Sequence, residues 1–254
     1  MVDWRLGAQY GRIAEVVSGL LRDAIRHAHT ARGAEQQAAT RLLAAAARAA
    51  DAIAFKYGAH DLSARLIDLM RWAADRSGDP LVQAATAYVR TEVFLAARAH
   101  AVGLAELEQA IDAAPPALSH PTTAARGALH MRAAVVAGRC EDSDTADIHL
   151  AHAQRLGDQV AREVVCLGTA FGPDSVRVHE LSVAVSLGRD HVDRALRVAT
   201  EWKPAASLPA ERRSGFYMGP RGHEWSATLP PCRRREPVAL RALGRRSLTG
   251  CYKR

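Results

Sequence analysis

The sequence predicts an all-α fold, a stack of antiparallel helix pairs, and two observations carry this prediction. Hydrophobic residues make up 48% of the 254 residues and aromatic residues only 5%, with alanine dominant. Alanine is the best helix former and lets neighbouring helices approach closely. Apolar residues also recur at steps of three and four along most of the chain, and no convincing alternating segment indicates a strand. Both patterns favour many closely packed helices over a sheet.

The predicted helices follow one another between short polar or glycine-containing breaks. The first is expected at 3–30, closed by Arg32 and Gly33, and the second at 34–57, closed by Gly58. The remaining expected helices, in chain order, are 61–77, 81–101 ending near Gly103, 104–113, 121–138, 142–156, a weakly patterned 159–169, 173–187, 191–202 and 208–218.

The segment 171–189 carries the clearest helix signals in the chain. Pro173 suits the first helical position, where a missing N–H costs nothing, and Asp174 complements the positive end of the helix dipole. Gly188 tolerates the left-handed conformation that ends many helices. Since another helix follows directly, this segment reads as a helix, a tight turn and a helix.

Glycines that we expect at helix ends suggest a degenerate repeat. Gly58, Gly103, Gly138 and Gly188 follow one another at intervals of 35 to 50 residues. Helix-turn-helix units of about 34 residues or somewhat more are the signature of tetratricopeptide arrays. In such arrays the pairs stack into a superhelix with a concave binding surface, because no pair buries its apolar face alone. We therefore predict a tetratricopeptide-like superhelix over 1–218.

The last segment, 219–254, differs in composition from the rest of the chain. It holds nine Lys or Arg residues and only two acids, so the net charge of +7 belongs to this segment and 1–218 is neutral overall. Alanine becomes scarce there and proline more frequent. We expect an irregular, disordered basic tail, translated from a shifted reading frame or divergent in its own right. A neutral body lacks the electrostatic footprint of specific DNA binding.

Several stretches resemble a known family, the C-terminal tetratricopeptide-like regulatory region of actinobacterial (Streptomyces-type) helix-turn-helix transcriptional regulators. The resemblance rests on the segments 54–64, 73–80, 171–188 and 208–213, of which Phe-Gly-Pro-Asp-Ser-Val-Arg-Val-His at 171–179 is the most specific. It covers roughly 1–218 and implies a regulatory sensing or interaction module. In relatives a DNA-binding domain precedes this region, and its absence here implies a domain standing alone or a truncated regulator.

The sequence contains no pattern that specifies a reaction or a metal. It has no G-x-S-x-G, H-E-x-x-H or P-loop motif. His149 and His152, three residues apart with Asp147 nearby, could face one ion, but catalytic zinc usually needs three protein ligands. We interpret them as two surface histidines on an alanine-rich helix. No catalytic residue, cofactor or metal is predicted.

Five residues are candidates for ligand binding on the concave surface. Arg90, Arg132 and Arg177 each interrupt an otherwise apolar first helix of a pair, and His130 and His179 lie eight and nine residues before glycines. On similar faces of successive units they could clamp a peptide carboxylate or a small acidic ligand. Arginines that extend their side chains to solvent are the alternative.

These observations predict a non-enzymatic module that senses a ligand or peptide, or binds a protein, in transcriptional regulation. Its expected partner is a protein or peptide in the concave groove or a small-molecule effector, with a homodimer left open. A protein-assembly scaffold without a small ligand is the alternative, and an enzyme without a recognisable motif is the third. No secretory signal, membrane span or C-x-x-C cysteine spacing is present, so a cytoplasmic protein with reduced thiols is expected.

Overall fold

The computed structural model of the chain describes residues 2–206 and 208–210 and is all-α, as the sequence predicts. Two short strands and one turn of 3₁₀ helix are the only additions in this part of the chain. The elements are α1 (Val2–Leu6), α2 (Tyr10–Thr30), α3 (Ala34–Lys56), α4 (His60–Ser77), α5 (Pro80–Ala96), α6 (His100–Ala113), α7 (His120–Arg139), α8 (Ser143–Val160), β1 (Val164–Cys166), β2 (Thr169–Phe171), α9 (Pro173–Leu187), η1 (Arg189–His191) and α10 (Val192–Glu201).

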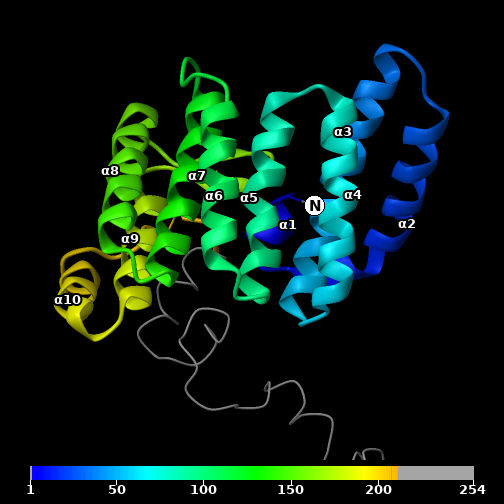
Figure 1. Cartoon of the computed structure of the whole chain (residues 1–254). Helices are drawn as coiled ribbons and strands as arrows, with labels where there is room; N and C mark the ends of the chain where they lie inside the picture. The colour runs from blue at the N-terminus through cyan, green and yellow to red at the C-terminus, as the bar shows by residue number, and fades with distance from the viewer. Residues whose placement is uncertain (1, 207, 211–254) are drawn as a thin grey trace, which may run out of the picture.

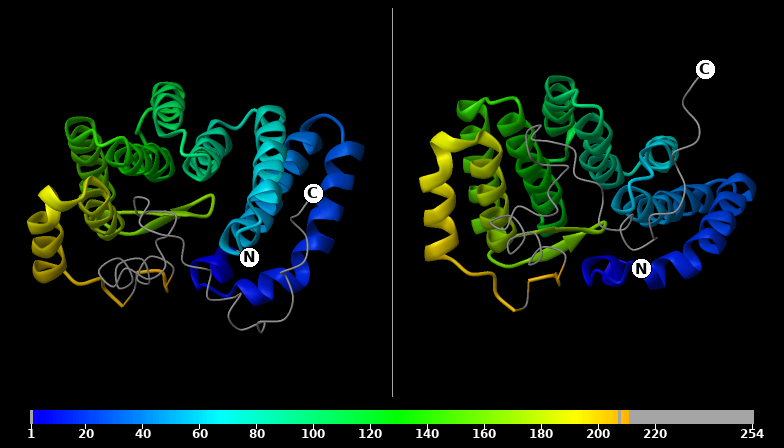
Figure 2. Two further views of the ribbon diagram at one scale, coloured as in Figure 1. Left: turned by 60° about the horizontal axis from the view of Figure 1, so that its bottom comes forward. Right: turned by 90° about the horizontal axis from the view of Figure 1, so that it is seen from below.

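The helices stand side by side in antiparallel pairs (Figure 1), and the row of pairs curves into an arch (Figure 2). After α2, the pairs are α3 with α4, α5 with α6, α7 with α8, and α9 with α10, each packed together. The first helices of successive pairs also contact one another, from α3 to α5, α5 to α7 and α7 to α9. These first helices therefore make the inner layer of the arch, and the second helices α6 and α8 lie outside it (Figure 2).

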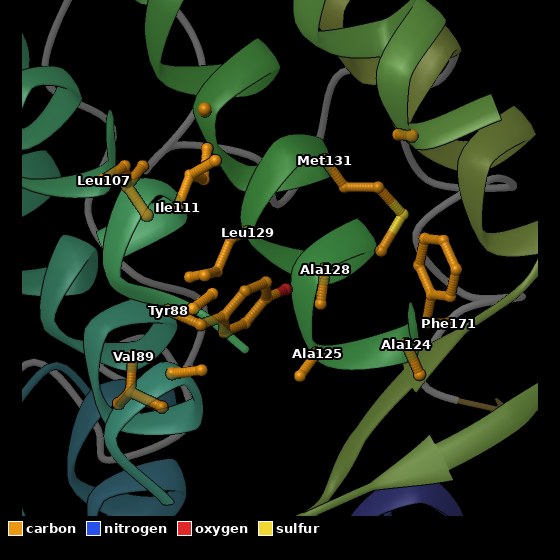
Figure 3. Close-up of a cluster of buried hydrophobic side chains, with 14 of the residues drawn as sticks. Tyr88, Val89, Leu107, Ile111, Ala124, Ala125, Ala128, Leu129, Met131 and Phe171 are labelled. Atoms are coloured by element: carbon orange, nitrogen blue, oxygen red, sulfur yellow. The ribbon is translucent and has the colours of Figure 1, made fainter. Parts of the chain in front are cut away.

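The centre of the core is α7, which is buried around most of its circumference. Leu129 and Met131 are fully buried, and they project in different directions from the helix (Figure 3). Leu107 and Ile111 reach this core from α6, and Tyr88 reaches it from α5. A helix that is apolar on nearly every side is typical of a buried position. This explains why apolar and polar residues alternate only weakly with the helical period along α7.

The N-terminal helix predicted over 3–30 is divided in two, which corrects that prediction. The break lies at 7–9, where Ala8 takes a positive φ of 58°. Gln9 then precedes α2 without a side-chain cap. The apolar pattern continues across this break, so hydrophobic spacing alone could not reveal it.

One glycine that we predicted at a helix end, Gly103, lies inside a helix. Helix α5 already ends at Ala96, and Gly103 lies in the first turns of α6, which extends the predicted 104–113 helix toward its N-terminus. A Cβ atom at Gly103 would lie 2.9 Å from Cβ of Phe94. Gly138 lies one residue before the end of α7, so the prediction that this helix ends there is confirmed. Gly103 thus allows α5 and α6 to approach closely, whereas Gly58, Gly78 and Gly188 have the positive φ of a chain reversal.

The helix predicted over 159–169 is wrong, because this segment forms a β-hairpin. Helix α8 extends to Val160, beyond the predicted end, and Ala161 ends it in the left-handed conformation. Strands β1 and β2 are antiparallel, with Cys166 opposite Thr169. The connecting residues Leu167 and Gly168 both have positive φ, of 47° and 82°, as a two-residue type I′ turn requires.

The hairpin lies on the inner side of the arch (Figure 2). Both strands contact α7, and β2 also contacts α9. The ring of Phe171 covers Gly127 so closely that a Cβ atom there would lie 2.0 Å from Cζ of the ring. At the other end, a Cβ atom at Gly168 would lie 3.5 Å from Nη2 of Arg5 in α1. The hairpin thus connects the centre of the stack to the N-terminal helix.

The helix expected at 208–218 and the basic tail at 219–254 lie almost entirely outside the described residues. Among the helices that are described, none combines the length and the apolar character needed to cross a bilayer. Cys140 and Cys166 are free thiols.

Candidate functional site

The candidate site is a pocket of about 490 Å³ between α6, α7 and α8. It lies on the outer side of the arch, where α6 forms one wall and α7 and α8 together form the other. Ionisable side chains dominate its lining, which consists of Glu108, Ile111, Asp112, Ala117, Arg126, His130, His149, His152, Arg155, Leu156 and Gln159.

Helical spacing brings these side chains to the pocket. Helix α7 contributes Arg126 and His130, one turn apart, and Pro121 with the cap Ser119 fixes where this helix starts. Residues three or four apart lie on the same face of a helix. The same rule groups Glu108 with Asp112 on α6, and His149, His152 and Arg155 on α8. The start of α8 is fixed by Asp142, whose carboxylate accepts a hydrogen bond from the backbone N–H of Thr145 at 3.0 Å.

Three histidines form a contact cluster at the centre of the lining. Nδ1 of His130 lies 3.0 Å from Nδ1 of His149, so one ring donates and the other accepts. The ring of His130 also stacks on that of His152, with centroids 4.7 Å apart and planes at 6°. Our interpretation of His149 and His152 as surface histidines is therefore wrong for His149, which is 7% exposed.

Burial keeps these histidines neutral. Desolvation, with smaller contributions from His149, His152, Arg126 and Arg155, lowers the pKa of His130 to about 3. Desolvation also lowers the pKa of His149, although the Glu108 carboxylate opposes this shift. The pKa of His152 is lowered by desolvation and by the neighbouring arginines. At neutral pH each ring therefore offers one hydrogen-bond donor and one acceptor.

His130 is poorly suited to act as a general base at neutral pH. An effective general base has a pKa near the operating pH, and His130 is far below it. The described lining contains no serine, threonine or cysteine that a base could activate. No three His, Cys, Asp or Glu side chains of residues 2–206 and 208–210 are arranged to hold a metal ion. Asp147, considered beside the two histidines, instead accepts a hydrogen bond from Arg194 at 2.6 Å.

The structure does not gather the five predicted ligand-binding residues into one site. Only His130 lines the α6–α8 pocket. Arg90 lines a smaller pocket, of about 140 Å³, between α4, α5 and α6, where it pairs with Glu106. Arg90 and His130 therefore face the outer helices, and not the concave surface on which we expected them.

The other three candidates have other partners. Arg132 stacks on the ring of Tyr88 at 4.1 Å and lies 3.7 Å from Glu92. Arg177 is exposed and pairs with Glu180 of its own helix. His179 is buried, with Nδ1 2.8 Å from the backbone oxygen of Ser175. Arg177 thus matches the alternative of a solvent-exposed arginine.

Arg132 belongs to a buried ionic network that joins the inner helices. Glu92 of α5 lies within 3.7 Å of both Arg132 of α7 and Arg48 of α3. Arg48 also pairs with the fully buried Asp51 at 2.9 Å, and Asp51 accepts a hydrogen bond from Ser63 at 2.6 Å. Removal of one member would leave an uncompensated buried charge. Arg132 therefore stabilises the stack, and its substitution would affect folding as well as any binding.

Comparisons with known proteins add no template for this site. No protein-family model, curated protein or solved structure matches the chain.

Proposed function

We propose that this chain is a non-enzymatic sensing module that binds a small molecule in the α6–α8 pocket. The observation that carries the proposal is the pocket itself, in which two buried histidines and two arginines converge on a space of about 490 Å³. Ligand pockets typically span roughly 300–1,000 Å³ and contain a few well-placed polar groups. Burial of polar side chains costs free energy, so their gathering at an open pocket supports a binding role.

The position of the pocket supports a regulatory use of binding. A ligand there would contact α6, α7 and α8 together and so set the spacing of two outer helices. Phe171 of the hairpin packs on Gly127 of α7, and the tip of the hairpin lies against α1. A ligand that binds more tightly at one spacing of α6 and α8 would increase the population of the conformation with that spacing. The shift would then reach the N-terminal helix, where an associated regulator of transcription can read it.

The outer pocket is a better-supported ligand site than the concave groove. Strands β1 and β2 pack on α7 on the inner side, and Cys166 and Thr169 line the same small cavity as Leu81 and Tyr88 of α5. Part of the inner surface is therefore covered by the chain itself. A partner protein would bind elsewhere on that surface or after the hairpin moves.

A thermal-shift screen of small metabolites against the full chain tests the proposal. A ligand that binds only the folded state at 100 times its Kd stabilises it by about 2.7 kcal/mol, so Tm should rise and saturate. Arg155→Ala should reduce the rise, because Arg155 lines the pocket. Arg177→Ala is the matched control, since Arg177 is an exposed arginine outside the pocket. Lack of any saturable rise, or an equal rise in Arg155→Ala, would refute the pocket as a sensor site.

A scaffold that assembles other proteins is the second candidate function. It is favoured by Val192 and Leu196, which lie one turn apart on α10 and are 47% and 60% exposed. Adjacent exposed apolar side chains on a helix that ends the described stack can form part of a protein interface. Purification with a bound protein, lost in Leu196→Glu and unaffected by Arg155→Ala, would favour this function over sensing.

A further inference from the structure

Resting on the proposed function, we infer that the ligand of the α6–α8 pocket is a small zwitterion, an amino acid or a short peptide with free termini. Its carboxylate would bind the arginines of α7 and α8, and its ammonium group would bind the carboxylates of α6. The separation of charge across the pocket carries this inference.

The two walls of the pocket have opposite charge. Helices α7 and α8 contribute Arg126 and Arg155, and α6 contributes Glu108 and Asp112. Within the described residues, neither arginine has a carboxylate within 4.0 Å, although both signs line one space. The opposite charges therefore line one space without pairing with each other within 4.0 Å, and a molecule with both charges can interact with both walls.

The basic wall is held in place for a carboxylate. Nη1 of Arg126 donates to the carbonyl oxygen of Ala114 at 3.0 Å, and Nη2 of Arg155 lies 2.9 Å from Nδ1 of His152. A guanidinium has five N–H donors, so each arginine keeps donors for a ligand. Arginine binds carboxylates through two parallel hydrogen bonds. Because the part-buried contact to Ala114 restrains Arg126, carboxylate binding by this arginine would cost less conformational entropy.

The acidic wall faces the histidine cluster without being neutralised by it. Oε1 of Glu108 lies 3.8 Å from Nε2 of His149, which is neutral because burial lowers its pKa. Asp112 has no ion pair within 4.0 Å among the described side chains. Two formal negative charges therefore balance the two arginines. If the histidines were protonated, the pocket would carry a net positive charge. It would then favour a ligand with only negative charge.

Apolar lining residues indicate what lies between the two charges. Ile111 of α6 is buried, Leu156 of α8 is half-buried, and both contribute to the pocket. Contact with an apolar side chain would remove the exposed surface of Leu156 from water. An amino acid with an aliphatic side chain, or a dipeptide of such residues, combines this apolar part with both charges.

Capped forms of one compound separate the contributions of the two charges. The twenty standard amino acids and L-leucyl-L-leucine are first compared by the Tm of the full chain. The compound giving the largest rise is then measured by calorimetry in three forms: free, N-acetylated and with an amidated carboxylate. A hydrogen bond to a charged group contributes about 1.5–3 kcal/mol, so each cap should weaken binding about tenfold or more.

Pocket variants assign each charge to its wall. Arg155→Gln should weaken binding of the free and N-acetylated forms and leave the amide unchanged, because the amide has no carboxylate to lose. Asp112→Asn should weaken the free form and the amide and leave the N-acetylated form unchanged. Arg177→Gln, outside the pocket, should change none of them.

The outcomes distinguish this inference from the proposed function. Equal affinity of a capped and a free form, or no binding by any compound of the panel, overturns the zwitterion. If another class of metabolite then raises Tm, and Arg155→Ala reduces that rise, the sensing function stands although the ligand is not a zwitterion. If no metabolite of any class raises Tm, the proposed function fails as well.

Discussion

Phe171→Ala is expected to lower the free energy of unfolding by about 3–5 kcal/mol, the usual cost of removing a buried phenylalanine. Its ring is fully buried and packs against α7 at Gly127. Most proteins of this size are stable by only about 5–15 kcal/mol, so the loss would be a large part of the total. Urea denaturation followed by circular dichroism measures it.

Gly127→Ala tests whether this packing is as close as the structure indicates. In the wild-type background the new Cβ would lie 2.0 Å from Cζ of Phe171, and the overpacking should cost roughly 1–3 kcal/mol. In the Phe171→Ala background the same substitution should stabilise the protein, because alanine favours a helix over glycine and its methyl group enters the vacated space. Gly19→Ala is the control, since nothing lies within 4 Å of that Cβ position. If Gly127→Ala changed the free energy of unfolding in the same direction in both backgrounds, the close contact with Phe171 would be contradicted.

Acidification from pH 6.5 to 4.5 is expected to destabilise the chain through the histidine cluster. The folded state keeps His130 neutral down to a pKa of about 3, whereas the unfolded chain protonates it near its ordinary value of 6.5. The unfolded state therefore binds more protons in this interval, so the free energy of unfolding decreases as the pH is lowered. At about 1.4 kcal/mol per pKa unit, His130 alone should cost roughly 2–3 kcal/mol. His149 and His152 shift in the same direction and add to the loss.

Urea denaturation at several pH values between 4.5 and 7.5 measures this dependence. His130→Gln should flatten the slope, because the side chain that opposes protonation in the folded state is gone. His29→Gln is the matched control on α2, where the ring is exposed. A wild-type slope that equals that of His130→Gln would show that His130 is not kept neutral by the fold.

The all-α class and most helix positions could be predicted because they depend on local signals. Pro80 and Pro121 near helix starts, and Gly78 and Gly188 after helix ends, mark boundaries that the structure confirms. The hairpin at 164–171 was missed because three-residue strands are too short to show an alternating pattern. Its only local signal is the Leu-Gly pair at the turn.

The glycines show why sequence alone could not place every boundary. A glycine that ends a helix and one that lets another side chain approach look identical in sequence. Gly103 is of the second kind, next to Phe94, and Gly127 is another, beneath Phe171. Which kind applies depends on a contact with another element, and residue spacing carries no information about that contact.

Part of the candidate site could also be predicted. The three-residue spacing of His149 and His152 indicated a shared helix face. Their partner His130 is 19 residues before His149, and its contact depends on how α7 and α8 are rotated against each other. Sequence spacing did not identify Arg126 and Arg155 as site residues. Arg155 nevertheless follows His152 by three residues, and Arg126 precedes His130 by four. Extending the shared-face rule to charged neighbours of each histidine would have identified both.

The NMR signals of the histidine rings give the most direct test of the proposal that the α6–α8 pocket binds a small ligand. Long-range ¹⁵N–¹H spectra of the full chain at pH 7 are compared with and without the compound that most raises Tm. The ring signals of His130, His149 and His152 should move with added compound and saturate together. Those of His27 and His29, which are exposed on α2, should stay in place. Unchanged signals from the cluster while Tm rises would place the binding site elsewhere and contradict the proposal.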